Sequence, residues 1–150
     1  MKLRNLFLFS FILLACHNAP VKAQEQNKTL VGKLENGSVI LTVDKAKMLA
    51  TYNANLLRLS DIDAKFSDIS IRSSSDKQYI LAFKGDTYRS SFLVTENNSN
   101  LYAADNISCT TSDCASEEFG CTPRVSGVSC WPCNNKGKCT KTVSNGSLLY

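Results

Sequence analysis

The chain has 150 residues with 17 Lys and Arg, 13 Asp and Glu and one histidine, so its formal net charge is +4. This length suits one modest domain with an appendage. The basic residues are scattered and form no stripe with interleaved aromatic residues, which argues against nucleic-acid binding. The single histidine is His17, near the N-terminus. We therefore expect no Ser-His-Asp or Cys-His arrangement in the folded domain, no enzyme activity, no cofactor and no histidine-containing zinc site.

The first residues have the pattern of an export signal. Lys2 and Arg4 precede an uncharged apolar run at 6–15 (LFLFSFILLA). The run has about ten residues, half of the roughly 20 that a membrane-spanning helix requires. We expect an exported protein whose mature chain contains no transmembrane helix.

Two cleavage sites compete after the apolar run. Residues 13–16 (LLAC) resemble the lipobox of bacterial lipoproteins, a family in which the cysteine acquires lipid and becomes the new N-terminus. Residues 21–23 (VKA) resemble an ordinary signal-peptidase site. Because a cysteine directly after an apolar run is uncommon, we favour a signal peptide at 1–15 and lipidation of Cys16, which predicts a membrane-anchored lipoprotein. Cleavage after 1–23 is the alternative and predicts a soluble periplasmic or secreted protein.

A flexible tether at 16–29 is expected to lead into a small domain at 30–107. Its first signals are a β-prone run at 38–42 (SVILT) and an amphipathic helix at 45–59, with Asp44 as the N-cap. Apolar side chains recur in the helix at spacings of three and four, at Leu49, Tyr52, Leu56 and Leu59, and the stripe is widened by Met48, Ala50 and Leu57. We expect this stripe to face the core.

Four further β-prone segments follow the helix, at 64–72, 78–84, 87–95 and 100–108. The polar connections between them are short, which is typical of neighbouring antiparallel strands. In the first segment Phe66 is out of phase with the later apolar residues, which predicts a bulge or a late strand start. The predicted fold class is α+β, with one amphipathic helix packed on an antiparallel β-meander of about four strands.

Six of the seven cysteines lie in the C-terminal part of the chain, at Cys109, Cys114, Cys121, Cys130, Cys133 and Cys139. Lipidation or removal of Cys16 leaves this even number in an exported protein, as three disulfides require. The surrounding sequence is rich in Ser, Thr, Gly, Pro and Asn, so it needs cross-links to hold its fold. We expect a cysteine-rich, disulfide-stapled tail at 108–142 with undetermined pairing, and disordered residues at 143–150.

Two alternatives stay open for these cysteines. The run at 130–133 (CWPC) resembles the active-site dithiol of thioredoxin-like proteins, which implies thiol–disulfide exchange through Cys130 and Cys133. That family opens a helix after the motif, whereas a turn-forming sequence follows it here. The second alternative is zinc or another metal bound by the cysteine cluster, although only one C-x2-C pair is present.

The leading interpretation is an exported, non-catalytic binding or interaction module stabilised by disulfides. Its partner is expected to be an unidentified protein or small molecule, together with a membrane if Cys16 carries lipid. For Trp131 the favoured role is a cap over the small disulfide core, and an exposed contact residue is the alternative.

Overall fold

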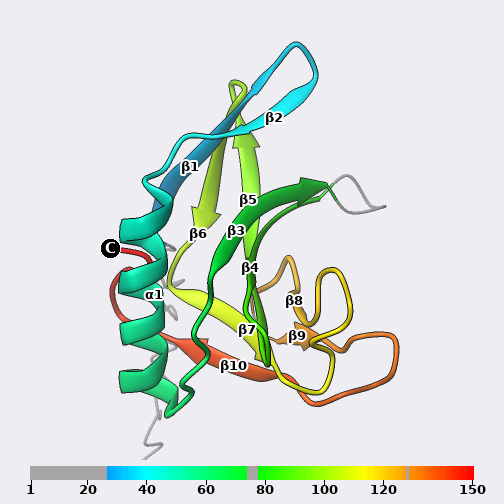
Figure 1. Cartoon of the computed structure of the whole chain (residues 1–150). Coiled ribbons are helices and arrows are strands. Elements are labelled where there is room, and N and C mark those ends of the chain that lie inside the picture. The colour runs from blue at the N-terminus through cyan, green and yellow to red at the C-terminus, as the bar shows by residue number, and fades with distance from the viewer. Residues whose placement is uncertain (1–26, 74–77, 128) are drawn as a thin grey trace, which may run out of the picture.

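The computed structural model describes residues 27–73, 78–127 and 129–150. In chain order the elements are β1 (Lys28–Glu35), β2 (Ser38–Leu41), α1 (Lys45–Ser60), β3 (Asp68–Ser73), β4 (Tyr79–Lys84), β5 (Arg89–Asn97), β6 (Asn100–Ala104), β7 (Ile107–Thr111), β8 (Thr122–Pro123), β9 (Cys130–Trp131) and β10 (Thr140–Val143). Figure 1 shows long curved strands with α1 along one side and the short strands β8 and β9 toward the other.

Six strands form a nearly closed antiparallel barrel in the order β2-β1-β6-β5-β4-β3. At the closure β2 lies beside β3, and among the described residues no ladder joins the two. β5 pairs with β6 through residues 94–97 and with β7 through residues 89–91, on the same edge. β7 therefore continues the line of β6, and β10 pairs with β7 to extend the sheet beyond the barrel.

The predicted α+β class is confirmed, and the sheet is larger than the predicted meander. The segments predicted at 78–84 and 87–95 form β4 and β5, and the segment at 100–108 divides into β6 and β7. β1 was not predicted, and it includes residues 28 and 29 of the expected tether; residues 16–26 of that tether lie outside the described part of the chain. The pairing of β1 with β6 shifts register between Leu30 and Gly32, which breaks the alternation that marks a strand in sequence.

The helix starts where the sequence predicted. The side chain of Asp44 accepts a hydrogen bond of 3.0 Å from the backbone N–H of Lys47 and so satisfies one free donor of the first turn. The fully buried residues of α1 are Met48, Tyr52 and Leu56, whereas Leu57 and Leu59 of the predicted apolar stripe are exposed. The stripe that faces the core is thus a narrow row at spacings of four. Among the described residues no helix is long and apolar enough to cross a membrane.

The segment after the helix reaches the core before it becomes a strand. β3 begins at Asp68, so the late strand start that was predicted around Phe66 is confirmed. The Phe66 side chain is buried, and the side-chain amide of Asn53 bonds both backbone groups of Phe66 at 2.9 and 3.0 Å. A helical side chain therefore replaces the strand partner that Phe66 lacks.

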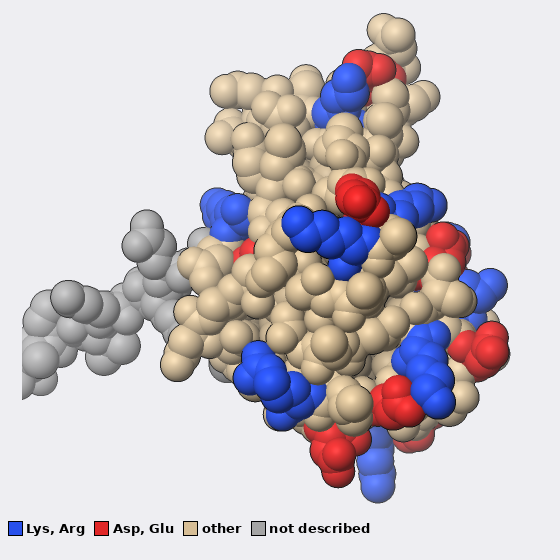
Figure 2. Space-filling view, turned by 60° about the vertical axis from the view of Figure 1, so that its left-hand side comes forward, with Lys and Arg blue, Asp and Glu red and all other residues tan. Residues whose placement is uncertain are grey.

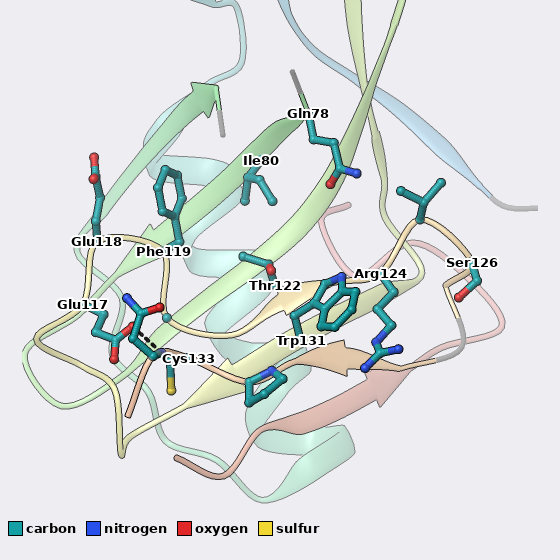
Figure 3. Close-up of a pocket in the computed structure, with 14 residues that line it drawn as sticks. Gln78, Ile80, Glu117, Glu118, Phe119, Thr122, Arg124, Ser126, Trp131 and Cys133 are labelled. Atoms are coloured by element: carbon teal, nitrogen blue, oxygen red, sulfur yellow. Dashed lines mark hydrogen bonds between the residues drawn. The ribbon is translucent and has the colours of Figure 1, made fainter. Parts of the chain in front are cut away.

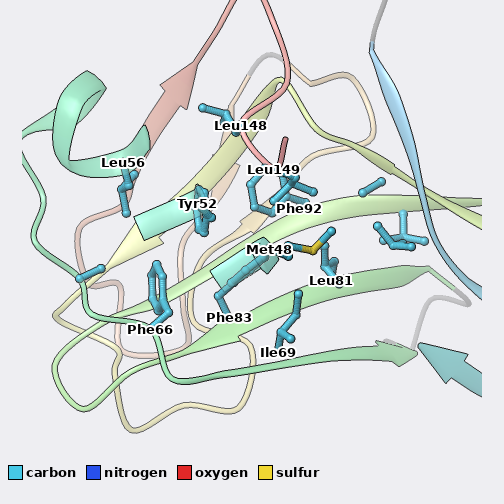
Figure 4. Close-up of a cluster of buried hydrophobic side chains, with 14 of the residues drawn as sticks. Met48, Tyr52, Leu56, Phe66, Ile69, Leu81, Phe83, Phe92, Leu148 and Leu149 are labelled. Carbon is cyan, nitrogen blue, oxygen red and sulfur yellow. The ribbon is translucent and has the colours of Figure 1, made fainter. Parts of the chain in front are cut away.

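Aromatic side chains from the helix and the sheet fill the centre of the barrel (Figure 4). The ring of Tyr52 lies 4.6 to 5.5 Å, between centroids, from those of Phe66, Phe83 and Phe92. These edge and offset contacts add to the free energy gained from burial of the rings. The helix is thereby fixed against the interior of the barrel.

The last residues of the chain differ from the expected disorder at 143–150. Leu148 and Leu149 are fully buried in the core, beside the aromatic rings in Figure 4. The backbone N–H of Leu148 donates to the carbonyl of Asp105 at 2.7 Å, and the Asn55 amide donates to the Leu148 carbonyl at 3.0 Å. Because β10 returns the chain to the barrel, these two leucines reach the apolar core. Their burial could not be predicted from the sequence, since they belong to no periodic apolar pattern.

The cysteine-rich region packs on the outer face of the barrel and is not a free tail. Its first cysteine, Cys109, lies within β7, so the expected boundary between 107 and 108 runs through a strand. Side chains alternate along β4: Leu81 and Phe83 belong to the core, while Ile80 faces the other side. On the neighbouring β5, the Ser91 hydroxyl donates to the Cys121 carbonyl at 2.5 Å, which ties the region to the sheet.

Candidate functional site

An open hollow of ≈ 990 Å³ lies between the outer face of β4 and the cysteine-rich region. Its walls include Gln78 and Ile80 from β4 and its approach, Phe119 from the loop after β7, and Trp131 from β9. Figure 3 shows Phe119 and Ile80 on one side of the hollow and Trp131 with Arg124 on the other. The volume is in the range of small-molecule sites, and the lining mixes aromatic, aliphatic and charged side chains as such sites do.

Trp131 and Arg124 share one face of the small ribbon formed by β8 and β9. Thr122 is paired with Trp131, and Arg124, two residues further along, falls on the same face as a diagonal neighbour. The guanidinium carbon of Arg124 lies 3.6 Å from the centre of the Trp131 ring, a close cation–π contact. Trp131 is nevertheless 52% exposed, because its ring forms part of the wall of the hollow.

The opposite face of the same ribbon is held by disulfides. Cys130 is bonded to Cys109 of β7, and Cys133 to Cys114, so the two residues between them, Trp131 and Pro132, are fixed on both sides. The alternation of side chains on a ribbon explains the division: Cys130 packs on the disulfide cluster and Trp131 lines the hollow. The expected stapling of this region therefore also sets the position of its tryptophan.

The two carboxylates that line the hollow already have partners. Glu117 accepts hydrogen bonds from the backbone N–H groups of Asn134 and Asn135 at 3.1 and 3.3 Å, which orders the loop after Cys133. Glu118 forms an ion pair with Arg72 at the end of β3. Both carboxylates stabilise the wall: that of Glu118 through an ion pair, and that of Glu117 through hydrogen bonds to backbone amides.

Arg124 differs from these carboxylates because it has no anionic partner among the described residues. The ion pairs of the described chain do not include it, and its Nε atom is buried with no hydrogen-bond acceptor. Its ordered contact is the ring of Trp131. The hollow thus contains one cation whose charge the described residues leave uncompensated.

The three disulfides connect the six cysteines in a crossed order. Cys109 pairs with Cys130, Cys114 with Cys133, and Cys121 with Cys139, so the first cysteine is bonded to the fourth, the second to the fifth and the third to the sixth. The disulfides form a separate buried cluster beside the barrel core. The candidate exchange dithiol, Cys130 and Cys133, is divided between two different bonds, whereas an exchange centre cycles through a disulfide between its own two cysteines.

Three sulfur atoms of this cluster are close enough to share a metal ion. The Sγ atoms of Cys114, Cys121 and Cys133 lie within 4.8 Å of one another, and all three residues are buried. Each of the three is part of a disulfide, and zinc requires thiolates as ligands. This cluster would therefore have to be reduced before it could hold the metal considered from the sequence.

A buried hydroxyl cluster lies between α1 and the sheet, away from the hollow. The phenol of Tyr52 shares a hydrogen bond of 2.5 Å with Ser90, whose hydroxyl lies 2.7 Å from that of Thr110. Burial raises the pKa of the Tyr52 phenol above its ordinary value of 10.0, and the surrounding hydroxyls oppose that change in part. Because the three groups satisfy one another and no ionised base adjoins them, the cluster stabilises the core.

Trp131 was considered from the sequence as a cap over the disulfides or as a contact residue, and the structure brings it together with Arg124, Phe119 and Ile80. These last three were missed because they come from three segments distant in sequence. A signal was available, since Phe119 and Arg124 are the only aromatic residue and the only cation between Cys109 and Cys130 in the sequence. The candidate lipidation site, Cys16, lies outside the described residues.

On the face of the molecule seen in Figure 2, basic and acidic side chains are intermixed and do not form separate patches. Lys and Arg alternate with Asp and Glu around a broad uncharged area on that face. Comparison of the chain with protein-family models, with curated proteins and with solved structures finds no match. The functional interpretation therefore depends on the chemistry of the hollow.

Proposed function

We propose that the chain is an exported, non-catalytic binding module, held at a bacterial membrane through a lipidated Cys16 or released as a soluble periplasmic protein. The observation that supports a binding role is the exposed Trp131 in the wall of a ≈ 990 Å³ hollow. A large aromatic side chain left half in solvent within a concave surface is typical of ligand sites.

The covalent and hydrogen-bonded framework around the hollow is also consistent with a binding role. Disulfides fix the backbone on both sides of Trp131, and Glu117 orders the loop that follows. A pre-formed site loses little conformational entropy when a ligand binds, which favours affinity. The disulfides in this proposal are structural, and the separate bonding of Cys130 and Cys133 supports that assignment over thiol exchange.

The absence of catalysis is part of the proposal. Between residues 27 and 150 the sequence has no histidine, and the two carboxylates of the hollow are occupied by backbone amides and by Arg72. Neither carboxylate is placed as a free general base or acid. The hollow therefore offers apolar contact surfaces and one cation without an anionic partner. These features suit the binding of a ligand and do not by themselves supply catalysis.

The export part of the proposal rests on the residues before 24 and is tested by mass spectrometry of the exported protein. We expect a mature N-terminus at Cys16 with a mass increase from attached acyl chains. A Cys16→Ser variant should lose the lipid mass and leave the membrane fraction. A native N-terminus at Met1 in the cytoplasmic fraction would refute export, and an unmodified N-terminus at Gln24 would select the soluble form.

The binding part is tested with N-phenyl-1-naphthylamine, an uncharged probe whose fluorescence rises in apolar sites. We expect saturable binding to the oxidised protein, weakened at least tenfold by Trp131→Ala because the ring forms a wall of the hollow. Leu57→Ala is the matched control, since it removes an apolar side chain of similar exposure (47%) from the outer face of α1. Equal binding by both variants would refute the hollow as the site.

A further inference from the structure

We infer that the hollow takes a small organic carboxylate with an apolar, planar body, bound with its carboxylate at Arg124 and its body between Trp131 and Phe119. This inference rests on the proposed binding function and names the ligand class. It depends on three observations: the charge of the hollow, the geometry of the cation, and the apolar surface opposite it.

Among the described residues that line the hollow, Arg124 is the charged side chain with neither an ion-pair partner nor a hydrogen-bond partner. Glu117 and Glu118 have partners within the protein, whereas Arg124 has none that is anionic. The Nε atom of Arg124 is buried without a hydrogen-bond acceptor, so the free energy lost on removing this donor from water is uncompensated within the protein. A ligand oxygen bearing negative charge supplies the missing acceptor, and a cationic ligand would be repelled.

The geometry of Arg124 favours a carboxylate in particular. Its guanidinium carbon lies 3.6 Å from the centre of the Trp131 ring, so the ring covers one side of the guanidinium. Figure 3 shows the two side chains next to each other in the wall of the hollow. A planar fork of N–H donors matches the two oxygens of a carboxylate and forms two parallel bonds. Contact with the Trp131 ring orders the guanidinium before the ligand arrives, which reduces the entropy lost on binding.

The rest of the hollow favours an apolar, planar ligand body. Phe119 is half-buried, and Ile80, on the outer face of β4, is almost fully buried. Both lie across the hollow from the Arg124–Trp131 pair in Figure 3. A ring placed between these walls would bury apolar surface on two sides, while the polar Gln78 and Thr122 lie in the remaining lining.

The chain carries its own reporter for the test. Trp131 is the only tryptophan in the sequence, so intrinsic fluorescence excited at tryptophan wavelengths reports on the hollow alone. The probes are 3-phenylpropionate, its uncharged analogue 3-phenylpropanamide, and the cationic 3-phenylpropylamine. Each is titrated into the oxidised full-length protein, with Trp131 emission and displacement of N-phenyl-1-naphthylamine as independent readouts.

We expect the carboxylate to bind at least tenfold more tightly than the amide and the amine not to bind. Arg124→Gln should remove the preference for the carboxylate while the amide binds as before, and Arg124→Lys should restore only part of it because the planar fork is lost. Arg58→Gln is the matched control, since it makes the same charge change on an exposed residue of α1. Its preference for the carboxylate should equal that of the wild type.

The following results would contradict either the carboxylate inference or the proposed binding function. Equal binding of carboxylate and amide, or a preference that survives Arg124→Gln, overturns the inference and leaves the hollow as an apolar binding site. Binding of N-phenyl-1-naphthylamine without displacement by 3-phenylpropionate also overturns it. If the uncharged probe does not bind in the hollow either, the proposed function fails together with the inference.

Discussion

The side-chain amide of Asn53 bonds both the N–H and the carbonyl of Phe66, at 2.9 and 3.0 Å. Through these two bonds the helix holds the segment that precedes β3 as a neighbouring strand would. Phe66 in turn places its ring against Tyr52 at the centre of the core. A single polar side chain on α1 thus positions an aromatic residue that lies outside every strand.

Replacement of Asn53 by alanine is therefore expected to destabilise the protein by about 1–3 kcal/mol, because two partly buried backbone groups lose their partner. Urea unfolding followed by circular dichroism measures the change. Asn55→Ala is the graded control, since Asn55 donates one bond to a backbone group, the Leu148 carbonyl. A smaller loss for Asn53→Ala than for Asn55→Ala would contradict the bridging role.

Tyr52 should make stability depend on pH in the alkaline range. Because its pKa is raised in the folded state, the folded protein keeps the phenol proton at pH values where the unfolded chain has lost it. The associated stability is complete below pH 10 and declines as the pH rises further. At neutral pH the free energy of unfolding of wild type should exceed that of Tyr52→Phe by about 0.5–1.5 kcal/mol, and this difference should shrink above pH 10.

Unfolding free energies measured from pH 7 to 11 test this dependence. Leu56→Ala serves as the control, because it removes a fully buried side chain that carries no ionisable group. Its deficit relative to wild type should stay constant over the same range. A constant deficit for Tyr52→Phe as well would show that the phenol titrates alike in both states.

The buried C-terminal leucines should behave as core residues. Leu149→Ala is expected to cost about 2–5 kcal/mol, the range for deletion of a fully enclosed leucine side chain. Val143→Ala, at an exposed position of β10, should cost less than about 1 kcal/mol. Thermal or urea unfolding compares the two variants, and similar small losses would mean that residues 148 and 149 do not pack as described.

Loss of one disulfide should weaken the cysteine-rich region and leave the barrel folded. The double variant Cys121→Ser/Cys139→Ser opens a loop with a sequence separation of 18 and is expected to lose about 2–4 kcal/mol. The cystines form a cluster apart from the barrel core, so the far-ultraviolet spectrum should be retained. Peptide mapping without reductant should still recover Cys109–Cys130 and Cys114–Cys133, and any other pairing would argue against the crossed order.

Local signals were sufficient for the elements that carry a clear repeat. Asp44 and the apolar spacing from Leu49 to Leu59 located the helix, and alternation located β4 and β5. The strand β1 was not predicted, because its register shift after Leu30 interrupts the alternation of side chains and because Gly32 adds no side chain to the pattern. A backbone irregularity of this kind is set by the neighbouring strand, which the local sequence does not describe.

The candidate site depended even more on tertiary structure. Even parity of the cysteines predicted three disulfides, while their crossed pairing follows from where β7, β8 and β9 meet. Trp131 was recognisable as an unusual residue in a polar segment, yet its partner Arg124 is defined by the register of the β8–β9 ribbon. Ile80 joins the hollow only because the cysteine-rich region covers the outer face of β4.

The crossed pairing also determines how the region responds to a cut in its backbone. Between Cys109 and Cys139, every peptide bond is enclosed by at least one of the three disulfides. The exposed turn that follows Arg124 lies between Cys121 and Cys130, where all three bridges span the chain. Trypsin acting there would add the mass of one water and release no fragment, so a nicked molecule would keep both walls of its hollow covalently joined.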